Sequence, residues 1–201
     1  MQPTDRSELG EYLNHLGLVG FGAEIGVEAG LNALNILNTW KGIGMFLIDP
    51  YDLSKCGTYI DGSANIEFEQ AYKDTLLNLQ DHSSRYILIK ETSDVAFPLL
   101  PSLDFVYIDG NHHNPQITRD LYNYWSLLRP GGLLCGHDYY DLDTPHFRCE
   151  VKASVDAFVE SHPGHFFTTP CTSWYLRKPN TPIPFHEPFN ISASFYDEPQ
   201  H

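Results

Sequence analysis

Two segments of the sequence combine acidic residues and histidines in a pattern that suits catalysis. The segment 107–113 reads YIDGNHH, and the segment 136–139 reads GHDY. Two carboxylates at one site suit a hard divalent cation such as Mg²⁺, which binds oxygen ligands and keeps several of its waters. A bound cation makes a hydroxyl more acidic, and a histidine titrates near the working pH, so it suits the role of general base. The candidate metal ligands are Asp109, His137 and Asp138, and the candidate catalytic residues are Asp109 and His112.

A glycine-rich turn lies earlier in the chain, at 23–30 (AEIGVEAG), where Gly26 and Gly30 follow Glu24. Glycines let the backbone approach a ligand that a Cβ would obstruct. Glu24 takes the place of the first glycine in a dinucleotide fingerprint, and its charge repels a pyrophosphate and attracts an ammonium group. The alternative is that these glycines serve only the packing of a helix on a strand.

A further acid, Asp49, ends the apolar run 44–48 (GMFLI). A carboxylate at the end of the second strand can accept hydrogen bonds from both hydroxyls of a ribose. The alternative is a turn or capping aspartate before Pro50. Together, the glycine turn and this acid indicate a cofactor of the adenosine type.

Short apolar runs alternate with helical periodicity and must position these residues. The expected strands cover about 22–26, 44–48, 85–89, 104–108 and 133–136, followed by a pair at 165–169 and 173–178. The expected helices cover about 7–16, 30–40, 63–80, 114–128 and 150–161. This alternation predicts a parallel sheet with helices on both faces, and the short connection 170–172 predicts an antiparallel hairpin. The candidate residues follow carboxyl ends of strands, where open sheets bind ligands.

Composition limits the class of protein. The 201 residues are 42% hydrophobic and carry a formal net charge of −14, so nucleic acid and anionic membranes are poor partners. We see no signal peptide or membrane span, and four scattered cysteines favour reduced thiols, so we expect a cytoplasmic protein. We expect one domain over 1–180, with an N-terminal helical segment at 1–19. A tail rich in proline and aromatic residues follows at 181–201.

The motifs EIGVEAG, LIDP, FVYIDGNHH and LLRPGGLLCGHDY occur in this order within residues 20–178. They resemble the class I S-adenosylmethionine-dependent methyltransferases, and most closely the branch called methyltransferase family 24. That branch is similar to the metal-dependent sugar O-methyltransferases of macrolide and aminocoumarin biosynthesis. The resemblance implies a Rossmann-like three-layer α/β sandwich whose seven-stranded, mostly parallel sheet has the order 3-2-1-4-5-7-6. It implies that the glycine turn holds the methionine end of the cofactor and Asp49 the ribose, with the adenine side after strand three. The implied cofactor-binding residues are Glu24, Gly26, Gly30, Asp49, Thr92, Ser93 and Asp109.

The expected activity is therefore S-adenosylmethionine-dependent methylation, with Mg²⁺ or another divalent cation assisting transfer to a sugar hydroxyl or another small polar acceptor. The segment 139–150 (YYDLDTPHFRCE) should wall the acceptor pocket. His137 often corresponds to a second acid in relatives, so a metal ligand, a substrate contact and a stacking residue all stay open for it. The alternatives are an NAD-dependent oxidoreductase on a related fold and a catalytically silent cofactor-binding or assembly domain. A small-molecule or glycan acceptor is the expected partner, and a homo-oligomer is compatible with the sequence.

Overall fold

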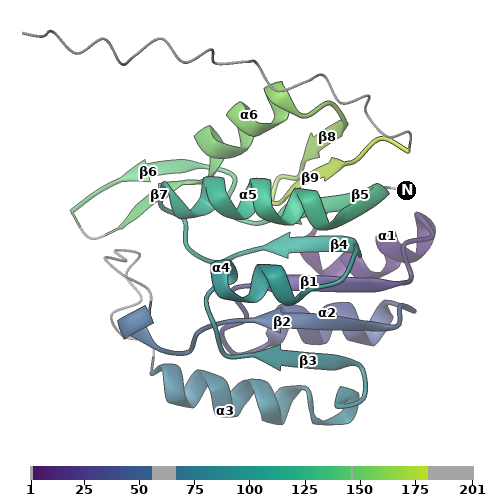
Figure 1. The fold of residues 1–201 in the computed structure, drawn as a ribbon, viewed down its shortest axis with the longest axis vertical. Coiled ribbons are helices and arrows are strands. Elements are labelled where there is room, and N and C mark those ends of the chain that lie inside the picture. The colour runs from purple at the N-terminus through teal and green to yellow at the C-terminus, as the bar shows by residue number, and fades with distance from the viewer. Residues whose placement is uncertain (1, 56–66, 146, 181–201) are drawn as a thin grey trace, which may run out of the picture.

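The computed structural model describes residues 2–55, 67–145 and 147–180, and its centre is a seven-stranded sheet (Figure 1). The strands lie in the order β3-β2-β1-β4-β5-β9-β8. Their bounds are β1 Phe21–Ile25, β2 Gly44–Ile48, β3 Tyr86–Ile89, β4 Leu103–Ile108, β5 Leu128–Gly136, β8 His165–Thr168 and β9 Trp174–Arg177. The first five pair in parallel, whereas β9 pairs antiparallel with β5 and with β8. Numbered within the sheet alone, this is the predicted order 3-2-1-4-5-7-6 with its C-terminal hairpin, and the prediction is confirmed.

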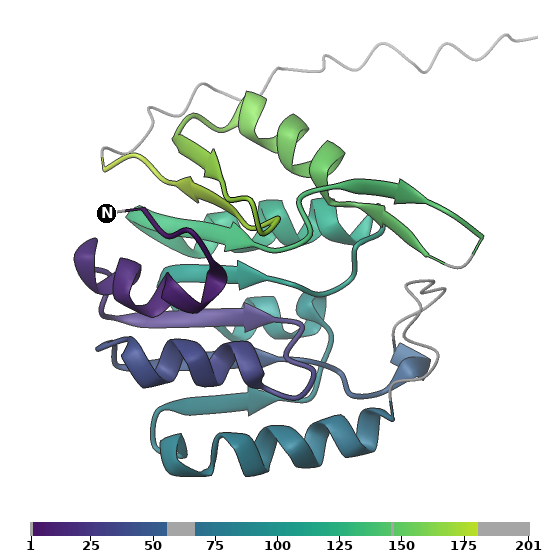
Figure 2. The same cartoon turned by 180° about the vertical axis from the view of Figure 1, so that it is seen from behind.

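Helices cover both faces of the sheet and make the molecule a three-layer sandwich (Figures 1 and 2). On one face lie α1, α2 and α3, and on the other lie α4, α5 and α6. Their bounds are α1 Leu9–His15, α2 Leu31–Thr39, α3 Phe68–Asn78, α4 Ser93–Ala96, α5 Gln116–Leu127 and α6 Val151–Ser161. A separate apolar cluster fills the space under each helical layer. The central position of β4 explains why five of its six residues are apolar or aromatic, because all six are buried between the two layers.

The helix α5 shows how periodicity sets the packing. Its buried apolar residues are Ile117, Leu121, Tyr124 and Trp125, which recur at spacings of four, three and one residues along one face. The exposed residues between them face solvent. Since one stripe of the helix is apolar, the helix can dock on the sheet in only one rotational setting, and that setting fixes which polar residues of its first turn face the cleft described below.

Several elements differ from the sequence prediction. The helix predicted at 63–80 is α3, which begins at Phe68, and residues 63–66 lie outside the described part of the chain. Strand β5 begins at Leu128, earlier than predicted, but its register with β4 shifts across residues 129–132 and regular pairing begins at Leu133, where the sequence placed the strand. The segment 139–150, predicted as a loop, contains a two-stranded ribbon of β6 (Asp141–Asp143) and β7 (Arg148–Glu150). This ribbon projects beyond the carboxyl ends of the sheet strands (Figure 1).

The N-terminal segment begins with a turn of 3-10 helix, η1 (Arg6–Glu8), which leads into α1. Asp5 caps this turn, because its carboxylate accepts a hydrogen bond of 2.8 Å from the Ser7 N–H. No helix among the described residues is long and apolar enough to cross a membrane. The tail at 181–201 lies outside the described residues, and the predicted domain boundary at 180 stays a prediction.

Candidate active site

A cleft of about 970 Å³ opens where the parallel strands end, and the turns after β1, β2, β4 and β5 line it. Backbone hydrogen bonds continue the sheet pairing past the strand ends. The Gly26 N–H donates to the Ile48 carbonyl at 2.9 Å, and the Asp109 N–H donates to the Ile25 carbonyl at 2.8 Å. The His137 N–H donates to the Ile108 carbonyl at 3.2 Å. Because these turns are tied to one another, the candidate residues that follow the strands converge at one edge of the sheet.

The glycine turn after β1 approaches the turn after β4 so closely that no side chain fits. A Cβ on Gly26 would lie 2.0 Å from the Asp109 carbonyl oxygen, and Gly26 has a φ of +82°. Gly30 has a φ of +75° and stands at the N-cap of α2. Both positions require a conformation that glycine adopts without steric cost. Glycine at position 26 therefore lets the turn after β1 pack directly against the backbone of the turn after β4.

Glu24 is almost completely buried below this turn, with a relative exposure of 1%. Its Oε1 accepts a hydrogen bond of 2.9 Å from Asn32 Nδ2, whereas its Oε2 has no hydrogen-bond partner. Burial raises the pKa of Glu24 to about 8, although the Asn32 bond acts in the opposite direction. Since an unpaired buried carboxylate oxygen is costly, Oε2 marks a position where a ligand donor would be stabilised. The sequence analysis missed Asn32, whose place in the first turn of α2 was the available signal.

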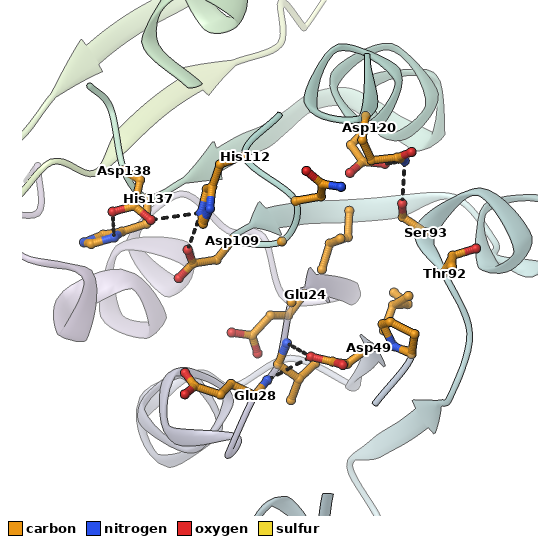
Figure 3. Close-up of a pocket in the computed structure, with 18 of the residues that line it drawn as sticks. Glu24, Glu28, Asp49, Thr92, Ser93, Asp109, His112, Asp120, His137 and Asp138 are labelled. Atoms are coloured by element: carbon orange, nitrogen blue, oxygen red, sulfur yellow. Dashed lines mark hydrogen bonds and ion pairs between the residues drawn. The ribbon is translucent and has the colours of Figure 1, made fainter. Parts of the chain in front are cut away.

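Asp49 holds the polypeptide as well as facing the cleft (Figure 3). Its Oδ2 accepts hydrogen bonds from the Val27 N–H at 2.9 Å and the Glu28 N–H at 3.0 Å, and its Oδ1 accepts one from the Tyr51 N–H at 2.9 Å. Burial raises its pKa, and these backbone hydrogen bonds oppose the rise. A carboxylate oxygen has two acceptor positions, so Oδ2 is fully used and Oδ1 keeps one. This geometry has room for one ribose hydrogen bond to Asp49 rather than the two expected from the sequence.

Thr92 and Ser93 line the cleft at the start of α4, on the far side from Glu24 (Figure 3). Ser93 is tied to α5, because its Oγ accepts a hydrogen bond of 3.0 Å from Gln116 Nε2 and its carbonyl accepts one of 2.9 Å from the Tyr124 hydroxyl. Gln116 also donates to Asp120 Oδ1 at 3.0 Å. Asp120 is 1% exposed, and burial raises its pKa to about 7. This buried cluster was not predicted, because Asp120 lies within a helix and carries no motif.

The acidic and histidine residues of the two predicted segments form one cluster at the other end of the cleft (Figure 3). One ligand atom from each of Asp109, His137 and Asp138 lies within 4.8 Å of the other two. His137 Nδ1 lies 2.9 Å from Asp138 Oδ1. His112 Nε2 lies 3.0 Å from Asp138 Oδ2 and 3.8 Å from Asp109 Oδ1. The three candidate metal ligands and the candidate base are therefore in mutual reach.

The charges of this cluster determine its protonation. Burial lowers the pKa of His112, but its hydrogen bonds and charge interactions with Asp109 and Asp138 outweigh burial and raise it to about 9. Burial favours the neutral form of Asp138, but hydrogen bonds and charge interactions with His112 and His137 hold its pKa below the usual range. An imidazolium cannot accept a proton, so His112 could serve as a base only if a cation took up the charge of the carboxylates. Asp138 has a φ of +55°, a conformation uncommon outside glycine that is found at functional sites.

Arg6 is a cleft residue that the sequence analysis missed. It belongs to η1, and its Nη1 lies 3.3 Å from Asp109 Oδ2. The polar N-terminus gave no sign of a functional residue, because only the tertiary fold carries this segment across the strand ends. Arg6 brings a positive charge to an otherwise acidic end of the cleft.

The segment 139–150 contributes to the cleft differently from the prediction. The Tyr139 hydroxyl donates a hydrogen bond to Asp156 on α6, and its ring lies 5.8 Å from that of Phe166. Tyr139 therefore packs against the body of the domain and does not line the cleft. Arg148 lines it, and the Phe147 ring lies 6.5 Å from the His112 ring. Arg148 at the start of β7 and Phe147 just before it thus bring a cation and an aromatic ring to this part of the cleft.

Comparison with known proteins adds family and fold. A family model described as a methyltransferase domain matches residues 23–139. A search of curated proteins gave no match. An O-methyltransferase from Bacillus cereus, solved in complex with SAH, superposes with a TM-score of 0.61 at 13% identity, over 89% of this chain and 82% of that chain. The O-methyltransferase TomG from Streptomyces achromogenes, solved in complex with SAM, gives a TM-score of 0.59 at 13% identity, over 89% and 81%.

A third solved structure shows how widely the fold is shared. Precorrin-6y C5,15-methyltransferase from Geobacter metallireducens gives a TM-score of 0.55 at 17% identity, over 78% of this chain and 70% of that chain. At these identities the likeness establishes the fold alone. The acceptor of this chain has to be argued from its own cleft.

Proposed function

Because the chain belongs to the methyltransferase domain family, we propose that it is an S-adenosylmethionine-dependent O-methyltransferase that acts on a small polar acceptor. One observation carries this proposal. The buried, unpartnered Oε2 of Glu24 shares a cleft with the cluster of Asp109, His137 and Asp138. The first feature suits the ammonium group of the cofactor, and the second suits an acceptor hydroxyl that must lose its proton.

The residues of the cleft fit the cofactor. A ligand ammonium group at Glu24 would satisfy Oε2 and stabilise the ionised carboxylate. Gly26 lets the turn after β1 pack against the Asp109 backbone, which brings together the two turns that would flank the methionine end. Asp49 keeps one acceptor position on Oδ1 for a ribose hydroxyl. Thr92 and Ser93, at the opposite end of the cleft from the acid–histidine cluster, support placement of the adenine there.

The acid–histidine cluster fits a divalent cation. Asp109 and Asp138 offer carboxylate oxygens, and His137 offers an imidazole nitrogen within the same 4.8 Å. Oxygen ligands suit Mg²⁺, and the added imidazole is also acceptable to Mn²⁺. A cation held there would lower the pKa of an acceptor hydroxyl and orient its oxygen.

The chain's own residues then perform the proton transfer. An acceptor hydroxyl bound at Asp109 and Asp138 lies within reach of His112 Nε2, and Asp138 orients that imidazole at 3.0 Å. His112 accepts the hydroxyl proton as the acceptor oxygen forms a bond to the methyl carbon. When bound, S-adenosylmethionine would supply the methyl group and would leave as S-adenosylhomocysteine, a neutral thioether.

A sugar hydroxyl is our proposed acceptor. The acceptor end of the cleft presents Asn111, His137 and Arg148, which donate or accept hydrogen bonds, and the Phe147 ring, which lies near His112. Sugars stack on aromatic rings and hydrogen-bond to such polar groups.

Binding and turnover test the proposal. Calorimetric titration with S-adenosylhomocysteine, S-adenosylmethionine and NAD should show binding of the first two. In a turnover assay with a panel of sugars, catechols and amines as acceptors, the protein should form S-adenosylhomocysteine when a sugar is present. Binding of NAD in place of both adenosyl ligands would refute the cofactor assignment. Binding without turnover on any acceptor would refute the enzymatic assignment.

The metal is tested separately. Turnover should stop in EDTA and return with Mg²⁺ or Mn²⁺, and Asp109→Asn should lose cation binding by calorimetry. The matched control is Asp74→Asn, an exposed position on α3 outside the cleft, which should bind the cation as the unmodified chain does. His112→Ala should lower kcat by roughly 10²- to 10⁴-fold, the usual contribution of a positioned base. Full turnover in EDTA would refute the metal and leave the cofactor assignment intact.

A further inference from the structure

The N-terminal segment places Arg6 next to the expected methionine end of the cofactor. Its guanidinium lies 3.3 Å from Asp109 Oδ2. The backbone of Asp109 is in turn the nearest neighbour of Gly26, and Arg6 lies near enough to Glu24 to affect its titration. Arg6 is thus a neighbour of both residues that would surround the amino-acid part of the ligand.

The segment that carries Arg6 is held in place at both ends. Thr4 N–H donates to Glu8 Oε2 at 2.8 Å, which closes the turn η1 on itself. Beyond η1, α1 is tied to α2 through Asn14, whose Nδ2 donates to the Thr39 carbonyl and whose Oδ1 accepts from the Lys41 N–H, both at 2.8 Å. The helix that follows Arg6 is therefore anchored to α2 without a ligand, and the turn that carries Arg6 is closed by its own hydrogen bond.

Arg6 differs from the other cations that line the cleft. Lys55 pairs with Glu91 at 2.9 Å, Arg119 with Asp94 at 3.3 Å, and Arg148 with Glu150 at 2.8 Å. None of these acids belongs to the acid–histidine cluster. The ion-pair partner of Arg6 is Asp109, a candidate metal ligand. A divalent cation bound to Asp109 would repel Arg6. Of these cations, Arg6 is therefore the one that would leave its present partner and become able to pair with an anion of the ligand.

The ligand supplies such an anion. The methionine end of the cofactor carries an ammonium and a carboxylate on the same carbon. Glu24 can pair with the ammonium. The residues expected from the sequence to hold this end (Glu24, Gly26 and Gly30) include no cation that could pair with the carboxylate. A buried or half-buried carboxylate without a donor is costly, and a guanidinium can bind it through two parallel hydrogen bonds.

We infer that Arg6 binds the carboxylate of the cofactor's methionine end, a conclusion that rests on the proposed function. On binding, the guanidinium exchanges Asp109 for the ligand carboxylate, and Asp109 becomes available to the cation. Glu24 then pairs with the ammonium and Arg6 with the carboxylate. Together they distinguish the full cofactor from adenosine ligands that lack an amino-acid end.

The test compares three ligands on Arg6→Ala by calorimetry. These are S-adenosylhomocysteine, its decarboxylated analogue 5′-deoxy-5′-(3-aminopropylthio)adenosine, and 5′-methylthioadenosine. In the unmodified chain the decarboxylated analogue should bind at least about tenfold more weakly than S-adenosylhomocysteine. In Arg6→Ala these two should bind equally, and 5′-methylthioadenosine should bind both proteins alike. Lys73→Ala, which removes a positive charge on α3 outside the cleft, should reproduce the unmodified pattern.

The outcomes separate the inference from the proposed function. If S-adenosylhomocysteine fails to bind the unmodified chain, the proposed function is wrong. If it binds, but Arg6→Ala keeps the preference for the carboxylated ligand, the inference is wrong. An equal loss of all three ligands would show a structural role for Arg6, and tighter binding of S-adenosylhomocysteine would show that Arg6 merely blocks Asp109. Either result would overturn the inference.

Discussion

Cofactor binding should depend on pH through Glu24. The pKa of this buried carboxyl is about 8 in the protein without ligand, against an ordinary value of 4.5. That difference corresponds to about 5 kcal/mol in favour of the neutral form. An ammonium group next to the unpartnered Oε2 favours the ionised form and lowers the pKa in the complex. Below about pH 8, binding must therefore release a proton.

The direction and size of the effect follow from this linkage. Affinity for S-adenosylhomocysteine should rise by up to about tenfold for each pH unit as the pH approaches 8, and should level off above it. Glu24→Gln cannot ionise, so its affinity should not change with pH through this range. It also loses a hydrogen bond to a charged group, worth about 1.5–3 kcal/mol, so above pH 8 it should bind about 10- to 150-fold more weakly.

The assay is calorimetric titration with S-adenosylhomocysteine in pairs of buffers that differ in ionisation enthalpy, because the difference in heat counts the protons released. Glu69→Gln is the matched control, since it removes the same charge from an exposed ion pair on α3 with Lys73. This control should keep the pH dependence of the unmodified chain. The reasoning is refuted if binding below pH 8 releases no proton, or if Glu24→Gln binds as the unmodified chain does.

Three further predictions concern the fold. Asp49→Ala removes the acceptor of three backbone N–H groups and should lower the free energy of unfolding by on the order of 3 kcal/mol; an unchanged urea midpoint would contradict this. Burial raises the pKa of Asp120 from 3.8 to about 7, so its contribution to stability is complete below about pH 4 and falls by up to about 4 kcal/mol as the pH rises to 7. Asp120→Asn should therefore unfold at a higher temperature than the unmodified chain at pH 8 and not at pH 4, and equal melting temperatures at pH 8 would contradict this. Truncation after Asn180 should leave a cooperative unfolding transition by circular dichroism, and loss of that transition would place the tail in the core.

Most of the fold was predictable because its signals are local. The apolar runs that became β1, β2, β3 and β4 were placed to within one residue at each end, since buried parallel strands need continuous apolar side chains. The short connection before β9 likewise required a hairpin. The prediction was incomplete at β5, where Leu128 already pairs with Leu103, the register shifts across residues 129–132, and regular pairing with β4 begins at Leu133. The strands of the ribbon, β6 and β7, have only three residues each, too few for their alternation to reveal them.

The candidate site was also predictable only in part, because only some of its signals are local in the sequence. The sequence alone determined which residues follow the strands, and thus that Glu24, Asp49, Asp109 and Asp138 reach one edge of a parallel sheet. Only the tertiary structure decided what each side chain contacts there. Asn32 donates a hydrogen bond to one of the two carboxylate oxygens of Glu24, and three backbone N–H groups donate to the carboxylate of Asp49. Arg6 comes from the N-terminal segment to pair with Asp109. Strand order follows from a periodic, local pattern of burial, whereas a charge partner is chosen by distance in space, which residues separated by a hundred positions acquire only when the chain has folded.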